Sequence, residues 1–227
     1  MNSNNNELID YLYQFMLPER ANAFKRALSN RTRYVSILLE DLFQHQNYSA
    51  VIRSVECFGI QDLHVIENRN KFNLNPDVVM GANKWLTIHQ HQITPTNSLQ
   101  STIASIKAKG YRLIVTTPNP EATPISELNL TQSPLCIAFG TELTGISPEL
   151  LALADEQITI PMYGLTASLN ISVSAAITLQ NITSRLRHEV SAWELPSTER
   201  EQIELEWLTK SLKRADLLKN HYISSSK

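Results

Sequence analysis

LCIAFGTELTGISPELLALADEQITIPMYGLTASLNISVSAAITLQNI, residues 135–182, is the stretch that decides the fold. It begins with an apolar run, Leu135–Phe139, that is typical of a buried strand. A loop with a glycine at each end, Gly140 and Gly145, comes next. Ser147-Pro148-Glu149 then opens a helix, because serine is a good N-cap and proline suits the first helical position. The first half of the stretch therefore predicts a strand, a glycine loop and a helix.

The second half repeats this order. Gln157–Ile160 predicts a strand that leads into Pro161–Gly164, and Ser168-Leu169-Asn170 opens a last helix. Glycine lets another group approach the backbone closely, and ligands of open α/β sheets bind beyond the carboxyl ends of strands. We therefore expect the ligand-binding end of the protein here. From the pattern alone, two ordinary turns fit equally well.

The rest of the chain continues the alternation. Strands are predicted at 34–39, 63–66 and 111–116, and helices at 47–58 and 98–109, with Asn47 at the N-cap of the first. The segment 68–85 shows no clear period and is predicted as loop. Strands that alternate with helices predict an α/β fold with a mainly parallel sheet flanked by helices.

The two ends of the chain differ from this centre. Residues 7–28 have helical periodicity interrupted at Pro18, and Thr198–Tyr222 predicts one amphipathic helix. We expect an N-terminal basic helical extension over 1–33, a central domain over 34–188 and a C-terminal helical extension over 189–227.

Composition limits the kinds of partner. The 227 residues carry a formal net charge of −2, so binding to a polyanion requires local basic patches. Such patches are present at Arg20, Lys25, Arg26, Arg31, Arg33, Arg185 and Arg187. They fit either a solvated helix face or an arm that contacts RNA phosphates.

Cysteine usage and hydropathy point to a cytoplasmic protein. Cys57 and Cys136 both sit in apolar runs and are expected to be reduced, buried thiols. No apolar run approaches 20 residues, and the N-terminus lacks the form of a signal peptide. We therefore expect a cytoplasmic location and no membrane partner.

Few catalytic motifs are recognisable by spacing alone. No G-x-G-x-x-G follows a predicted strand, and there is no P-loop, nucleophile elbow or metal-ligand spacing. Arg53 lies close to the buried stripe of its predicted helix, so it requires an anionic partner unless its side chain reaches the surface. Pattern alone predicts a small-ligand site at the strand ends and leaves an RNA partner open.

Three motifs extend this interpretation, and they occur in the order Asn47-x-x-Ala50-x-x-Arg53, Phe139-Gly140-x-Glu142-x-x-Gly145 and Ile160-Pro161-Met162-x-Gly164 with Ser168-Leu169-Asn170. The set resembles the motifs of the SpoU/TrmH family of RNA 2′-O-ribose methyltransferases, within the SPOUT superfamily. The likeness is greatest to members that act on tRNA guanosine, and it spans about residues 34–188.

The resemblance implies a SPOUT-type fold with a C-terminal trefoil knot, a homodimer with its active site at the subunit interface, and S-adenosyl-L-methionine as methyl donor, with no metal required. The donor contacts would come from Thr116, Gly140, Ile160, Met162, Leu165 and Leu169.

The resemblance also implies the reaction, which is methyl transfer to the ribose 2′-hydroxyl of the D-loop guanosine of tRNA, guanosine 18. Arg53 would be the catalytic arginine, either as base or as orienting group, because a guanidinium is a weak base candidate. The other catalytic positions would be Asn47, Glu142, Ser168 and Asn170. The alternatives are activity on rRNA or on another tRNA nucleotide, and a catalytically silent RNA-binding homologue.

Overall fold

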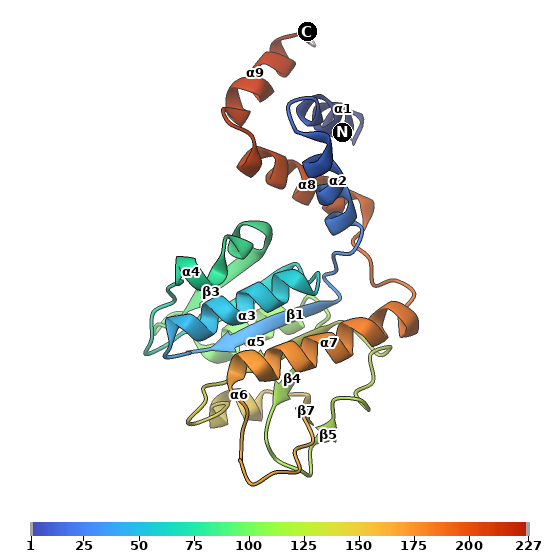
Figure 1. Ribbon diagram of the computed structural model, residues 1–227. Helices are drawn as coiled ribbons and strands as arrows, with labels where there is room; N and C mark the ends of the chain where they lie inside the picture. The colour runs from blue at the N-terminus through green and yellow to red at the C-terminus, as the bar shows by residue number, and fades with distance from the viewer. Residues whose placement is uncertain (1, 226–227) are drawn as a thin grey trace. The chain divides into compact units, whose positions relative to one another are not determined.

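The structure is a computed structural model that describes residues 2–225, and it consists of two compact units. One unit is Thr32–Trp193, and the other combines residues up to Arg31 with those from Glu194 onward. Figure 1 shows the strands and helices of each unit.

The larger unit is built on a sheet of seven strands in the order β3-β2-β1-β6-β4-β7-β5, and every neighbouring pair is parallel. The strands are β1 Val35–Glu40, β2 Asp62–Glu67, β3 Thr87–Gln92, β4 Arg112–Thr116, β5 Thr123–Pro124, β6 Leu135–Phe139 and β7 Glu156–Thr159. The predicted α/β fold with a parallel sheet is confirmed, and β6 has the predicted bounds.

Helices cover both faces of this sheet (Figure 1). The helices are α3 His45–Cys57, α4 Pro76–Val79, α5 Leu99–Lys107, α6 Pro148–Ala152 and α7 Ile171–Glu189, with a 3-10 turn, η1, at Ala82–Trp85. Residues of α3 and α7 pack with Ile137 and Phe139 on one face, whereas residues of α5 and α6 pack with Cys136 and Ala138 on the other. Alternate residues of β6 thus enter two separate cores, which explains its uninterrupted apolar sequence.

Two strands and two short helical segments of this unit were not predicted. β3 has the sequence TIHQHQ, and it pairs with β2 over its whole length. The segment predicted as loop holds α4 and η1, with Asn75 as N-cap of α4. Polar β3 forms because backbone pairing with β2 is available, and this is a tertiary effect that local sequence does not reveal.

The smaller unit contains the helices α1 Asn2–Tyr13, α2 Pro18–Leu28, α8 Ser197–Ser211 and α9 Ala215–Ser225. Its core includes Ile9, Leu12 and Leu208, and the rings of Phe24 and Trp207 meet edge to face. The break at Pro18 is confirmed. The single helix predicted over Thr198–Tyr222 is wrong, because Arg214 has a left-handed backbone (φ 58°) and separates α8 from α9.

Among residues 2–225, no helix is both long and apolar enough to cross a membrane. The C-terminal knot stays a prediction. The predicted boundaries of the central domain, between residues 33 and 34 and between residues 188 and 189, also stay a prediction.

Candidate functional site

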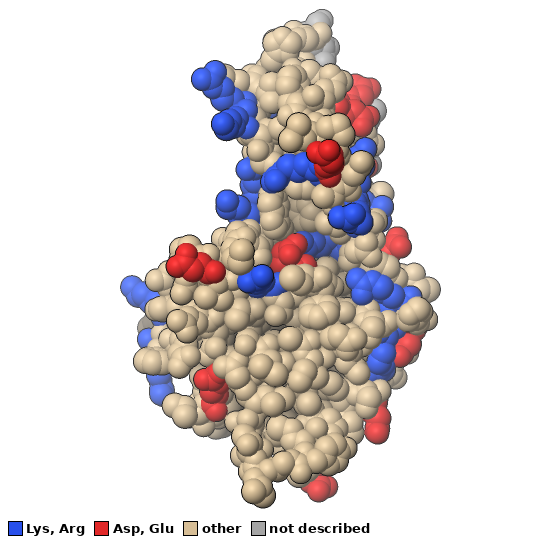
Figure 2. Space-filling model, in the orientation of Figure 1, with Lys and Arg blue, Asp and Glu red and all other residues tan. Residues whose placement is uncertain are grey.

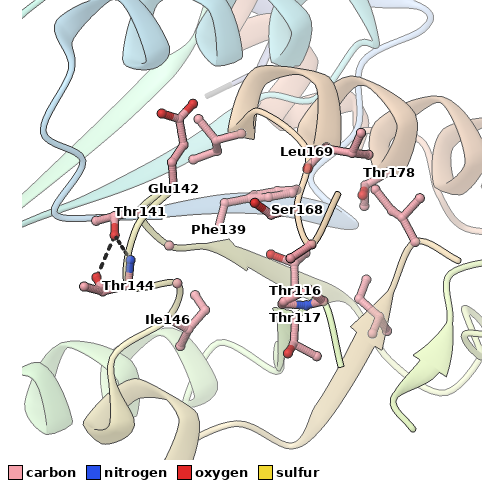
Figure 3. Close-up of a pocket in the computed structure, with 18 of the residues that line it drawn as sticks. Thr116, Thr117, Phe139, Thr141, Glu142, Thr144, Ile146, Ser168, Leu169 and Thr178 are labelled. Atoms are coloured by element: carbon pink, nitrogen blue, oxygen red, sulfur yellow. Dashed lines mark hydrogen bonds between the residues drawn. The ribbon is translucent and has the colours of Figure 1, made fainter. Parts of the chain in front are cut away.

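A cavity of about 420 Å³ lies at the carboxyl ends of β4, β6 and β7. Its wall includes Thr116 at the end of β4 and Thr117 after it, the loop after β6, Ile160 after β7 and the segment that leads into α7 (Figure 3). The hydroxyl of Thr116 donates to the carbonyl of Ala138 at 3.0 Å and so joins two of these strand ends. The volume is in the range of small-ligand sites, about 300–1,000 Å³, and the position is the one expected for an open α/β sheet.

The loop after β6 is closed on itself. The backbone N–H of Thr141 donates to the carbonyl of Gly145 at 3.0 Å, and the N–H of Gly145 donates back to Thr141 at 2.9 Å. The hydroxyls of Thr141 and Thr144 lie 2.7 Å apart within the loop (Figure 3). A Cβ on Gly140 would lie 2.1 Å from the carbonyl oxygen of Gly145, so the loop closes only with glycine there.

A polar cluster of three side chains adjoins the pocket. Asn47 donates from Nδ2 to Oε1 of Glu142 at 3.2 Å, and Asn170 donates from Nδ2 to the same oxygen. Asn170 Nδ2 also lies 3.4 Å from Oδ1 of Asn47. The three predicted catalytic residues come from α3, the loop after β6 and the start of α7, and the fold brings them into direct contact.

Helix ends explain how two of these residues are held. Asn170 is the N-cap of α7, and its Oδ1 accepts from the backbone N–H of Ser172 at 2.8 Å. The predicted cap role of Asn47 is wrong: α3 begins at His45, so Asn47 lies in the first turn. Because its side chain does not cap the backbone, it is available to Glu142.

Ser168 is exposed and lines the pocket. Five of the six predicted donor-contacting residues also line the pocket. These five are Thr116, Gly140, Ile160, Met162 and Leu169. Leu165 does not line the pocket, and its side chain is fully exposed at 107%. It lies in the loop 161–169, where the chain points this side chain outward.

Arg53 lies outside the pocket wall of its own chain. It is exposed on α3, six positions after Asn47, which corresponds to about 9 Å along the helix. Its guanidinium reaches the surface, so the close spacing to Val51 and Val55 does not bury the charge. Among the described residues, Arg53 is therefore not part of the hydrogen-bonded cluster of Asn47, Glu142 and Asn170.

The predicted RNA-contacting residues differ in environment. Arg20, Lys25 and Arg26 are all exposed, and the guanidinium of Arg20 lies over the ring of Phe24 while the ammonium of Lys25 lies over that of Tyr13. Arg31 is 1% exposed with its guanidinium over Trp207, so it packs inside the smaller unit and is not accessible to a phosphate. Its assignment as a surface contact is wrong, because a distant tryptophan provides its partner.

The remaining three basic residues belong to the larger unit. Arg33 pairs with Asp62 at 2.8 Å, and Arg187 lies over the ring of Trp193. Arg185 binds Glu189 and donates to the carbonyls of Ile125 and Leu128. These contacts fix all three side chains in place.

Two features of the site were missed at the sequence level. Thr178 is fully buried on α7, lines the pocket and has an Oγ1 without a hydrogen-bond partner among the described residues. Glu40, at the end of β1, is buried and accepts hydrogen bonds from Ser147. The sequence holds a signal for each of them: Thr178 is a threonine within an apolar helix face, and Glu40 is an acidic residue that follows an apolar strand run.

Comparison with known proteins identifies relatives over most of the chain. The sequence model of the SpoU rRNA methylase family matches residues 34–180. A Borreliella burgdorferi protein named tRNA (guanosine(18)-2′-O)-methyltransferase is 36% identical over 212 residues, which covers 93% of this chain and 94% of that protein. A protein of the same name from Escherichia coli K12 is 30% identical over 164 residues, 72% of this chain and 69% of that protein.

A solved structure is also similar. The TrmH/SpoU tRNA modifying enzyme of A. aeolicus superposes with a TM-score of 0.74 at 25% sequence identity, covering 86% of this chain and 98% of that one. The matched part of the sequence includes the polar cluster, the pocket and Arg53.

Proposed function

The chain belongs to the SpoU methylase family, and on that premise we propose that it transfers a methyl group from S-adenosyl-L-methionine to the ribose 2′-hydroxyl of guanosine 18 of tRNA. The observation that carries the proposal is the contact of Asn47, Glu142 and Asn170 beside a pocket at the strand ends. The names of relatives that match nearly the whole chain support tRNA as substrate.

The pocket suits the donor. Residues of the closed loop and of the segment before α7 line it, and Gly140 lets the backbone of Gly145 approach closely enough to close the loop. Thr116, Gly140, Ile160, Met162 and Leu169 would hold the donor. When bound, it supplies an electrophilic methyl group on a sulfonium.

The residues of the chain then have to orient and deprotonate the hydroxyl. In the transfer, the 2′-oxygen would form a bond to the methyl carbon as the carbon–sulfur bond breaks, the sulfonium would leave as the neutral thioether S-adenosyl-L-homocysteine, and the hydroxyl proton would pass to solvent water by way of the adjacent phosphate. We assign Arg53 to align the hydroxyl and the adjacent phosphate, because a guanidinium stays charged and offers several donors. Glu142, held by two amides, and Ser168 would position the ribose from the other side.

The position of Arg53 outside its own pocket leads us to propose a homodimer in which the active site forms at the interface. The exposed face supports this: α7 shows Val173 and Ile177 at 44% and 39% exposure, one turn apart. Figure 2 shows few charged side chains over α3 and α7. Sedimentation equilibrium of the full chain tests this, and a monomer at micromolar concentration would contradict it.

The basic residues Arg20, Lys25, Arg26, Arg33, Arg185 and Arg187 are proposed to contribute to tRNA binding. A tRNA substrate also supports a cytoplasmic location.

The deciding experiment incubates the full chain with labelled S-adenosyl-L-methionine and unmodified tRNA, followed by mapping of the modified nucleotide. We expect one 2′-O-methylguanosine at position 18, and none on tRNA in which that guanosine is replaced. Methylation of ribosomal RNA alone, or of another tRNA nucleotide, would overturn the substrate assignment. Absence of donor binding would overturn the enzymatic assignment.

A further inference from the structure

Glu40 is an acidic side chain in the interior of the larger unit. It is the last residue of β1 and is 7% exposed. Its neighbour Leu39 pairs with Phe139, the last residue of β6, so Glu40 lies beside the point where the pocket loop begins. A buried carboxylate is unfavourable unless strong hydrogen bonds compensate.

Both oxygens of Glu40 accept hydrogen bonds from one residue. The backbone N–H of Ser147 donates to Oε2 at 2.8 Å, and the hydroxyl of Ser147 donates to Oε1. The same hydroxyl oxygen accepts from the N–H of Leu150 at 3.1 Å and so caps α6. Glu40 therefore holds both the backbone and the side chain at the start of this helix.

Ser147 is the residue where the pocket loop ends. The loop leaves β6 at Gly140, closes on itself between Thr141 and Gly145, and reaches α6 through Ile146, which lines the pocket. One end is fixed by the sheet, and the other end depends on the two bonds to Glu40. Glu142 projects from the same loop to Asn47 and Asn170.

The ionised carboxylate costs stability at this position. Burial raises the pKa of Glu40 above its usual 4.5, although the bonds from Ser147 oppose this shift. The carboxylates of Asp41 and Glu149 raise it further. A site that retains a carboxylate against these costs has a use for its two acceptor oxygens.

We propose that Glu40 is a positioning residue of the donor pocket, which fixes the exit of the 140–147 loop through Ser147 and thereby holds the pocket wall and Glu142 in place. This inference rests on the proposed function. Glu40 itself does not line the pocket, so its effect passes through Ser147.

The test compares Glu40→Gln with Glu149→Gln. Glutamine keeps the size of the side chain but offers only one acceptor, so one Ser147 donor loses its partner. Glu149 is exposed and lies on the first turn of the same helix, so Glu149→Gln removes a carboxylate charge nearby without affecting the bonds to Ser147. For Glu40→Gln we expect the Kd and the KM for S-adenosyl-L-methionine to rise about 10-fold, with the KM for tRNA unchanged. For Glu149→Gln we expect wild-type values.

Hydrogen exchange gives a second readout that does not require activity. Amides of residues 141–146 should exchange faster in Glu40→Gln, while amides of β1 and β6 keep their protection. Wild-type donor affinity together with wild-type loop exchange in Glu40→Gln would overturn the inference, as would uniform loss of protection across the sheet. If Glu40→Gln does not fold, Ser147→Ala decides by the same two measurements, because it removes one of the two bonds.

These readouts separate the inference from the proposed function. If the wild-type chain binds no S-adenosyl-L-methionine, the proposed function fails, and the exchange comparison still decides whether Glu40 holds the loop.

Discussion

Asn47 and Glu142 lie 95 residues apart in the chain, yet Nδ2 of the amide is 3.2 Å from Oε1 of the carboxylate. The contact joins the first turn of α3 to the loop after β6. Because Asn170 donates to the same oxygen, the carboxylate is directed by two amides at once. Pre-oriented polar groups of this kind are effective in catalysis because they need little reorganisation during the reaction.

Replacing Glu142 by Gln should remove the negative charge from this arrangement with little change in size. A glutamine keeps an oxygen that can accept from the amides of Asn47 and Asn170, but these hydrogen bonds are then no longer strengthened by a carboxylate charge. We expect kcat for tRNA methylation to fall at least about 100-fold. Steady-state assays of Glu142→Gln beside Glu121→Gln, an exposed acid elsewhere, measure this. Wild-type kcat in Glu142→Gln would remove the cluster from the mechanism.

Arg53→Ala should separate chemistry from donor binding. The side chain lies outside the pocket wall, so calorimetry should give an unchanged Kd for S-adenosyl-L-methionine. Methyl transfer should fall by about 100-fold or more, because the hydroxyl loses its orienting group. Arg69→Ala, an exposed arginine of the same unit, is the control and should retain activity. Full activity of Arg53→Ala would exclude Arg53.

Gly140→Ala should disrupt the closed loop. The new Cβ would lie 2.1 Å from a backbone oxygen, which cannot move without opening the Thr141–Gly145 pair. We expect a loss of about 2 kcal/mol in the free energy of unfolding and a large loss of donor affinity. Gly164→Ala is the matched control, because a Cβ there meets nothing within 4 Å. Equal stability of the two variants, measured by denaturant unfolding, would contradict the loop geometry.

Thr178→Val should leave the unliganded protein as stable as the wild type or more stable. The buried hydroxyl has no partner in the described structure, so its removal eliminates a desolvation cost. Thr183→Val on the same helix is the comparison, because that hydroxyl donates to the carbonyl of Leu179 at 2.7 Å. Thermal unfolding should show a loss of about 1 kcal/mol for Thr183→Val only. A comparable loss in Thr178→Val would show that its hydroxyl is bonded in solution.

His64 should make stability depend on pH. Burial, with the neighbouring imidazoles of His89 and His91, holds the pKa of His64 at about 3 instead of 6.5. Below pH 6.5 the unfolded chain binds a proton at this position and the folded chain does not, so the free energy of unfolding falls as the pH drops toward 3. Above pH 6.5 neither state is protonated there, and this contribution vanishes.

His64→Phe should weaken that acid dependence, because phenylalanine keeps a ring beside His89 and His91 but does not titrate. His188→Gln, an exposed histidine on α7, should leave the dependence unchanged. Urea unfolding between pH 4 and 7 tests both variants. Parallel pH profiles for wild type and His64→Phe would refute the effect.

Local sequence predicted the parts of the fold that depend on neighbouring residues. The apolar run of β6 and the cap at Ser147 were both expected, since each depends on residues within a few positions. The start of α3 was misplaced, because Gln44 precedes the helix without making a side-chain cap. The break at Arg214 was also missed, since no glycine or proline marks it.

Features that depend on contacts between residues far apart in the chain were harder to predict from the sequence. Charge alone marked Arg31 as a phosphate contact, whereas its partner ring, Trp207, comes much later in the chain. The motifs named Asn47, Glu142 and Asn170, but their shared hydrogen bonds follow from how three separate elements pack. The link from Glu40 to Ser147 joins positions 107 residues apart and has no local signature.

The pairing of β1 bears on how the chain reaches this structure during synthesis. β1 lies between β2 and β6, and Val35 pairs with Leu135, so one edge of β1 stays unpaired until about a hundred further residues have left the ribosome. Contacts of such long sequence separation form slowly. The nascent chain therefore exposes an apolar strand edge through much of translation, and we expect its yield to depend on chaperones that shield such edges.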